Sequence, residues 1–114
     1  MELKGENYRI SYDPLTGTIT CQGGLRLQGI KGYASVMELL NDIADLKPET
    51  IILDMRELRF LNSSGIATFS KFVIRVRNTK ASQLIIRGTR EFPWQTVSLK
   101  NMRRLMSDIV IEFE

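Results

Sequence analysis

The segment Asn62-Ser63-Ser64-Gly65 places three polar side chains before a glycine, and it carries more potential chemistry than any other part of the chain. Each polar side chain can accept hydrogen bonds from the unpaired amides at a helix start, and removal of such a cap costs about 1 kcal/mol. A phosphate on a hydroxyl at this position would meet the free N–H groups and the positive end of the helix dipole. Its added charge of about −1.5 to −2 would be costly to desolvate in an apolar partner interface. The segment therefore predicts a helix cap at which a phosphate, if added, is accommodated without unfolding the helix and disfavours association with a partner.

Histidine is absent from the chain, and this excludes more chemistry than any other feature of the composition. Ser-His-Asp and Cys-His catalysis, imidazole acid–base steps and histidine-containing zinc sites all need a side chain that the sequence lacks. No pair of acidic residues stands at catalytic spacing in a recognisable loop, and no glycine-rich segment has the spacing of a phosphate-binding loop. We therefore expect a binding or regulatory module that is not an enzyme and has no catalytic residues, metal or cofactor.

The composition is typical of a globular domain. The 114 residues are 43% hydrophobic and 25% charged, and a chain of this length buries about two-thirds of its unfolded surface without disulfides. The single cysteine, Cys21, cannot form an internal bridge, which favours a reducing compartment. The first residues contain no apolar signal region, and no run approaches the roughly 18 apolar residues of a membrane span. These features predict one cytoplasmic domain over residues 1–114.

Charge is distributed unevenly along the chain. The net charge is +3, but residues 59–104 hold ten Lys and Arg against one acidic residue, while both flanking segments are acidic. This layout favours electrostatic steering of a partner toward the basic segment 59–104. Cations on solvated helix faces explain the same count equally well, and both interpretations remain open at this level.

The first half of the chain predicts a hairpin followed by a helix and a buried strand. Residues 8–12 and 18–21 have β-type patterns on either side of a turn-rich Asp-Pro-Leu-Thr-Gly segment. Apolar residues recur at helical spacing from 33 to 46, with acidic residues on the opposite face. Residues 50–55 form a short apolar run typical of a strand in a parallel sheet.

The second half continues this alternation of helices and strands. An apolar stripe follows Gly65, then a strand over 82–88, a helix that opens at Phe92-Pro93 and a final strand over 108–113. The order β-β-α-β-α-β-α-β predicts an α/β domain. Its mixed β-sheet has an N-terminal hairpin and βα crossovers and is packed with three main helices. The stripe consists of Ile66, Phe69, Phe72, Val73 and Val76.

The stretch from Ile51 to Ile66 resembles the signature of STAS domains, the family of bacterial anti-sigma factor antagonists. In that family a strand of the form hydrophobic-Leu-Asp-hydrophobic is followed by a short link and by Asp-Ser-Ser-Gly or Asp-Ser-Thr-Gly at a helix start. Upstream, Gly24–Gln28 is similar to the family's Gly-x-Leu-x-Leu segment, so the resemblance covers the chain nearly end to end. The sequence matches the signature, with the family's spacing, at Leu53, Asp54, Ser63, Ser64 and Gly65.

The resemblance implies a partner-switching regulator that binds a serine kinase or an anti-sigma-type partner. In such proteins the first Ser of the motif is phosphorylated by a kinase of the histidine-kinase-like ATPase class and dephosphorylated by a metal-dependent serine phosphatase. Ser63 occupies that position. The switch loop implied by the motif comprises Asp54, Asn62, Ser63, Ser64 and Gly65. On the helix that follows, we expect the partner-binding residues Ile66, Lys71 and Arg75.

Asp54 also invites comparison with the phospho-accepting Asp of receiver domains. Those domains need a cluster of acidic residues after the first strand and a Lys after a later one, and this sequence has neither. We therefore expect a structural role in which the Asp54 carboxylate accepts hydrogen bonds near the end of its strand or organises the loop that follows.

Two alternatives to the phosphorylation switch remain open. The family's usual Asp before the phosphorylated serine is Asn62 here, which removes a charge and leaves room for a constitutive scaffold, docking subunit or homo-oligomer. A nucleic-acid-binding domain is the other alternative, although aromatic residues are not interleaved with its cations as on a base-stacking surface. The cations that would carry it are Lys71, Arg75, Arg77, Lys100, Arg103 and Arg104.

Overall fold

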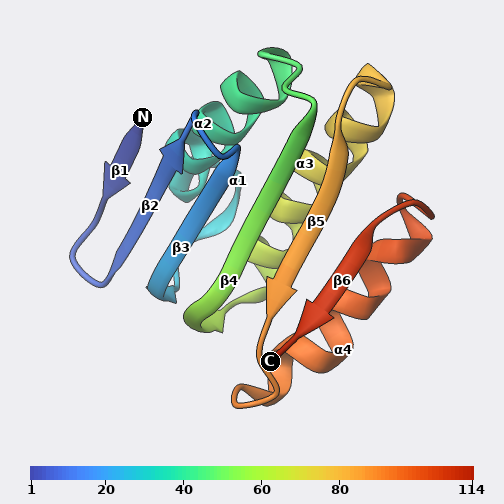
Figure 1. Ribbon diagram of the computed structural model, residues 1–114. Helices are drawn as coiled ribbons and strands as arrows, with labels where there is room; N and C mark the ends of the chain where they lie inside the picture. The colour runs from blue at the N-terminus through green and yellow to red at the C-terminus, as the bar shows by residue number, and fades with distance from the viewer.

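Six strands form one mixed sheet whose spatial order, from β1 to β6, follows their order along the chain (Figure 1). The computed structural model describes residues 1–114. The first three strands pair antiparallel, and the pairs from β3 to β6 are all parallel. The strands are β1 (Glu2–Lys4), β2 (Tyr8–Asp13), β3 (Thr18–Leu25), β4 (Thr50–Leu61), β5 (Gln83–Gly88) and β6 (Val110–Phe113).

The predicted N-terminal hairpin is confirmed, and it is joined by a strand that we did not predict. Strands β2 and β3 pair antiparallel with Tyr12 opposite Ile19. Gly17 closes their turn at a φ of +72°, where any Cβ would clash with the backbone oxygen of Thr50. Strand β1 pairs with β2 along only three residues, with Leu3 opposite Ile10. A segment this short carries no periodicity that would reveal it in the sequence.

The helices lie together on one face of the sheet and leave the other face bare (Figure 1). Each parallel connection steps in the same direction across the sheet, and right-handed crossovers that all advance in one direction place every helix on the same side. The helices are α1 (Gly29–Gly32), α2 (Ala34–Asp45), α3 (Ser63–Thr79) and α4 (Pro93–Asn101), followed by the 3-10 helix η1 (Met102–Arg104). The three predicted helices correspond to α2, α3 and α4, whereas no helix was predicted over the four residues of α1.

The core lies between the sheet and this layer of helices. Alternate residues of the central strands, such as Leu53 and Ile86, are completely buried against it, and so are Leu40 of α2 and Phe72 of α3. Each such side chain contributes roughly 1.5–3 kcal/mol relative to an exposed one. The Cys21 thiol belongs to the same layer, and its burial, with a smaller contribution from Asp54, raises its pKa far above the ordinary range.

Strand β4 is twice as long as predicted and runs directly into the switch segment. The sequence indicated a strand ending near Met55, followed by a link, but pairing with β3 continues to Leu61. Two register shifts in the β3–β4 ladder break the alternation of apolar and polar residues after Asp54, so the period-two pattern fails there. The strand therefore delivers Asn62 to the start of α3 at a fixed position.

The helix before the last strand is shorter than its apolar pattern suggested. Leu99 and Met102 are buried, whereas Leu105 and Met106, which continue the same helical spacing in the sequence, follow the end of η1 and are half-buried. The side chain of Gln95, which the sequence did not single out, is completely buried in this region. Its Nε2 donates to the carbonyl oxygens of Met55 and Leu58 at 2.7 and 3.0 Å. Its Oε1 accepts a hydrogen bond from the amide of Thr89, the residue after β5. This one side chain of α4 therefore connects β4 with the end of β5.

Candidate functional site

The switch segment is the junction between β4 and α3, where Asn62 acts as the N-cap. Asn62 has extended backbone angles, and its Oδ1 accepts a hydrogen bond from the amide of Gly65 at 2.9 Å. This geometry satisfies one of the amides that a helix start leaves unpaired. Of the three polar residues that could have capped the helix, Asn62 is therefore the one that does so.

A second set of hydrogen bonds holds Asn62 against the segment that follows β3. Its Nδ2 donates to the carbonyl oxygen of Leu27 at 2.7 Å. The Tyr33 hydroxyl donates to Asn62 Oδ1 at 2.6 Å and also lies 3.1 Å from the carbonyl oxygen of Leu25. Burial raises the pKa of Tyr33, so the hydroxyl keeps its proton at neutral pH. Asn62 thus uses both ends of its amide, one as the helix cap and one as the tie to the β3 exit.

Gly65 is required by close packing at the third helical position. The residue is buried, and an added Cβ would lie 2.6 Å from the Tyr33 hydroxyl oxygen and would also clash with the Leu61 side chain. A larger residue would therefore force the side chains of Leu61 and Tyr33 to move. The glycine of the motif therefore allows α3 to start directly beside Tyr33 and Leu61.

Ser63 is the exposed residue of this junction. It occupies the first position of α3, and its hydroxyl is not needed as a cap because Asn62 fills that role. The amides of Ser63 and Ser64 stand in the first turn, where no earlier helical carbonyl can accept from them. A phosphate on Ser63 would therefore have free donors within reach and the positive end of the α3 dipole beneath it.

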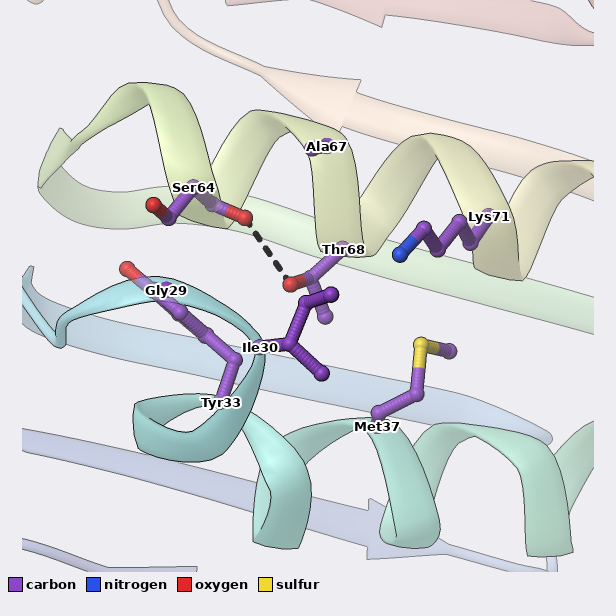
Figure 2. Close-up of a pocket in the computed structure, with 8 residues that line it drawn as sticks. All are labelled: Gly29, Ile30, Tyr33, Met37, Ser64, Ala67, Thr68 and Lys71. Carbon is purple, nitrogen blue, oxygen red and sulfur yellow. Dashed lines mark hydrogen bonds between the residues drawn. The ribbon is translucent and has the colours of Figure 1, made fainter.

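A groove separates α1 and α2 from the first half of α3, next to the switch segment. Figure 2 shows Ile30 and Met37 on one side of this groove, with Thr68 and Lys71 of α3 on the other. The cavity measures about 130 Å³, and the side chain of Ile30 is 80% exposed at its rim. We call it the α1–α3 groove, lined by Gly29, Ile30, Tyr33, Met37, Ser64, Ala67, Thr68 and Lys71.

The three expected partner-binding residues occupy different environments. Ile66 is half-buried and packs against the core, whereas Lys71 is exposed and lines the α1–α3 groove. Arg75 is also exposed, but its guanidinium forms two hydrogen bonds with the Asp45 carboxylate of α2, at 2.9 and 2.7 Å. These bonds outweigh a small effect of burial and hold the pKa of Asp45 below its ordinary value. Of the three residues, Lys71 is thus the only one that lines the α1–α3 groove, which Ser64 lines at its other end (Figure 2).

Asp54 lies apart from the rest of the motif. Its neighbours Leu53 and Met55 are buried in the core, so Asp54 lies on the opposite face of β4, roughly 25 Å along the strand from Asn62. Burial acts to raise the pKa of Asp54, but hydrogen bonds from the Arg56 side chain and amide outweigh it and lower the pKa. Arg56 also contacts the Glu114 carboxylate at 3.0 Å. Asp54 accepts hydrogen bonds as expected, but it neither ends its strand nor organises a loop.

Several residues of this region were missed from the sequence. Tyr33 was expected only as the start of a helix, and Leu27 only as part of the Gly24–Gln28 segment, because nothing local connects them with a motif about 30 residues later. Ile30 had no predicted role. The only signal in the sequence is that it is an apolar residue in a short segment, Gly29–Gly32, that has no helical or strand periodicity. No cluster of His, Cys, Asp or Glu is arranged to hold a metal ion. None of the helices has the length and apolar character needed to span a bilayer.

Comparison with known proteins decides the family. The model of the STAS domain matches residues 32–110, which include the whole switch segment and all residues of the α1–α3 groove except Gly29 and Ile30. This chain belongs to the STAS domain family. Searching curated proteins with the sequence of this STAS domain gave no match.

Two solved structures from Pseudomonas aeruginosa share the fold of the STAS domain. One is the crystal structure of the diguanylate cyclase SiaD in complex with its activator SiaC. A chain of this complex aligns with a TM-score of 0.72 at 17% identity, over 100% of this chain and 99% of that one. The other is SiaC, with a TM-score of 0.70 at 16% identity, over 100% and 98% of the two chains. At these identities the likeness is one of fold.

Proposed function

We propose that this STAS domain is a non-enzymatic regulator that binds a protein partner around Ser63 and the α1–α3 groove, and that phosphorylation of Ser63 switches the binding off. The observation that carries the proposal is that different residues cap α3 and expose a hydroxyl at its start. Asn62 makes the structural hydrogen bonds, which leaves the Ser63 hydroxyl exposed and accessible to an enzyme. A residue in this position can be modified without any loss of the cap.

The switch acts through charge on the docking face. A phosphate at the first position of α3 meets unpaired amides and the positive helix end, so it does not break the helix. A partner that covers Ser63 would have to desolvate about −1.5 to −2 charges, against the apolar rim of Ile30 and Met37. The modification therefore weakens association and leaves the domain folded.

The partners follow from the family and from the similar complex. Family resemblance supports a kinase of the histidine-kinase-like ATPase class, an anti-sigma-type partner and a serine phosphatase, acting in the cytoplasm where ATP is present. SiaC is described as an activator in complex with a diguanylate cyclase. That complex supports a target enzyme whose activity changes when the regulator binds.

The hydrogen bonds of Asn62 give a structural reason for an asparagine at this position. The replacement of the family's Asp by Asn is therefore weaker support for a constitutive scaffold. An Asp at position 62 would accept from Gly65 but could not donate to the Leu27 carbonyl, as the Asn62 amide does. The Asn in place of the family's Asp thus has a structural reason that is independent of phosphorylation. The proposal keeps the switch and treats the scaffold as the outcome of a negative test.

The experiment uses the full chain as bait for partners, with Ser63→Ala and Ser63→Asp compared under the same conditions. Ser63→Ala should retain the partner and Ser63→Asp should lose it. Ser35→Asp is the matched control, since Ser35 is also an exposed serine in the first turn of a helix. Equal retention by the Ser63→Ala and Ser63→Asp baits would establish the scaffold instead. Mass spectrometry after treatment with the captured kinase should locate the phosphate on Ser63, and a phosphate elsewhere would reject the switch.

A further inference from the structure

Four of the eight cations of the basic segment that lack ion-pair partners lie together at the end of α3 away from Ser63. The ion pairs of the chain engage Arg9, Arg56, Arg75 and Arg87. Four other cations line one depression of about 530 Å³ where the end of α3, the start of β5 and η1 meet. We call this depression the basic groove. Its charged residues are Arg77, Lys80, Arg103, Arg104 and Asp108.

One wall of the basic groove is held in place. Arg77, in the last turn of α3, donates from Nη1 to the carbonyl oxygen of Leu105 at 3.0 Å, which joins α3 to the end of η1. Lys80 follows in the left-handed conformation that ends the helix. Arg103 and Arg104 belong to η1 and are exposed on the other side. The cations therefore approach the depression from two elements whose separation the Arg77 bond fixes.

The positive charge of the basic groove is larger than the negative charge that the fold places beside it. Cations in the last turn of a helix are stabilised by its dipole, which is equivalent to about half a negative charge. Asp108 supplies one full negative charge, so an excess of more than two positive charges remains. This excess calls for a ligand with at least two negative charges. The Ser107 hydroxyl at the same rim is exposed and offers one more donor.

We propose that the basic groove binds a compact oligophosphate, either free or as the phosphate chain of a nucleotide. The forked N–H groups of arginine match phosphate oxygens two at a time, and this groove holds two exposed arginines, Arg103 and Arg104, beside Arg77, which already donates to Asn78 Oδ1 and to the Leu105 carbonyl. Its volume is that of a small-molecule site, whereas an acidic protein segment docks over a broader surface. No aromatic ring lines it, so the phosphates and not a base supply the affinity. The site is independent of the switch, roughly 21 Å from Ser63 along α3.

The test is calorimetric titration of the full chain with sodium tripolyphosphate at about 0.15 M salt, where weak surface attraction is screened. The wild-type chain should bind, and the double variant R103Q/R104Q should bind at least about tenfold more weakly. The matched control is K4Q/K31Q, which removes the same charge from exposed lysines outside the groove and should change the affinity less than about twofold. Circular dichroism checks that both variants are folded.

Titrations with two further ligands, ATP and hexaglutamate, distinguish a free oligophosphate from a nucleotide and from an acidic protein segment. ATP with the same affinity as tripolyphosphate identifies the phosphates alone as the ligand, and tighter ATP binding identifies a nucleotide; both results support the site. Hexaglutamate that binds as tightly as tripolyphosphate would overturn the proposal in favour of an acidic protein segment. Absence of tripolyphosphate binding, or an equal loss in both double variants, would also overturn it.

Discussion

The side-chain amide of Asn62 donates to the carbonyl oxygen of Leu27 at 2.7 Å while its oxygen caps α3. The first bond joins the exit of β3 to the exit of β4, and the second fixes the start of the helix that carries Ser63. Each requires a different end of the same amide group. Asn62 is thus a structural residue in the middle of a functional motif.

Asn62→Asp tests this double role. Aspartate keeps the cap but turns a carboxylate oxygen toward the Leu27 carbonyl, so we expect a loss of about 1–3 kcal/mol in the free energy of unfolding at pH 7. Urea unfolding followed by circular dichroism measures it. Asn7→Asp, at an exposed loop position, should stay within about 0.5 kcal/mol of wild type. A stable Asn62→Asp protein would contradict the role assigned to the Leu27 bond.

Ser63→Asp tests whether the switch leaves the fold intact. A negative charge in the first turn of α3 interacts favourably with the helix dipole and the free amides, so stability should rise by about 0.3–1 kcal/mol at low ionic strength. Thermal unfolding of Ser63→Asp and Ser63→Asn shows the difference due to charge. If Ser63→Asp unfolds several degrees below Ser63→Asn, a phosphate would act by disrupting α3 and not by its charge on the partner face.

The Asp54–Arg56 pair should make stability depend on acid pH. Because the folded-state pKa of Asp54 is lowered, its contribution is complete above the unfolded-state pKa of about 4 and is lost as the pH falls through the folded-state value. Asp54→Asn should therefore cost about 1–2 kcal/mol at pH 7, and the difference from wild type should shrink below about pH 4. Urea unfolding at several pH values tests this. Asp42→Asn, an exposed carboxylate outside any ion pair, is the control. A penalty that stays constant with pH would show that the charge of Asp54 is unimportant.

Gln95→Leu tests the buried amide that joins β4 to α4. Leucine has a similar size but leaves two carbonyl oxygens and the Thr89 amide without partners, so we expect a loss of about 2–4 kcal/mol. The same substitution at the exposed Gln83 should change little. Chemical denaturation compares the two variants. Equal stabilities would mean that water or a backbone shift replaces the bonds of Gln95.

The elements with long periodic patterns could be predicted from the sequence. The stripe of α3 carries enough repeats to identify the helix and its buried face, and the apolar run at the start of β4 identifies a strand. That run indicated a strand buried on both faces, which is wrong, because the helices cover only one face and Ile52 is half-buried. Strand β1 and helix α1 could not be found in this way, because three or four residues hold no full period and their conformation follows from contacts made elsewhere. The second half of β4 was missed because two bulges shift its alternation.

The candidate site was predictable to the extent that it is local. The cap, the exposed hydroxyl and the glycine follow from four consecutive residues and the helix after them. The bonds from Asn62 to Leu27 and Tyr33, and the Arg75–Asp45 pair, join residues about 30 positions apart. Such contacts depend on how helices and strands pack against each other, which periodicity within one element does not specify.

The thiol of Cys21 is completely buried, so its reactivity reports how often the folded domain opens. A thiol reagent reacts with the ionised form, which is scarce here, and the sulfur in the central layer has no route to the surface while the sheet is intact. Modification must therefore wait for molecules in which β3 has separated from the helices. The rate at which a thiol reagent labels Cys21 therefore measures the frequency of this opening, and no cysteine has to be introduced for the measurement.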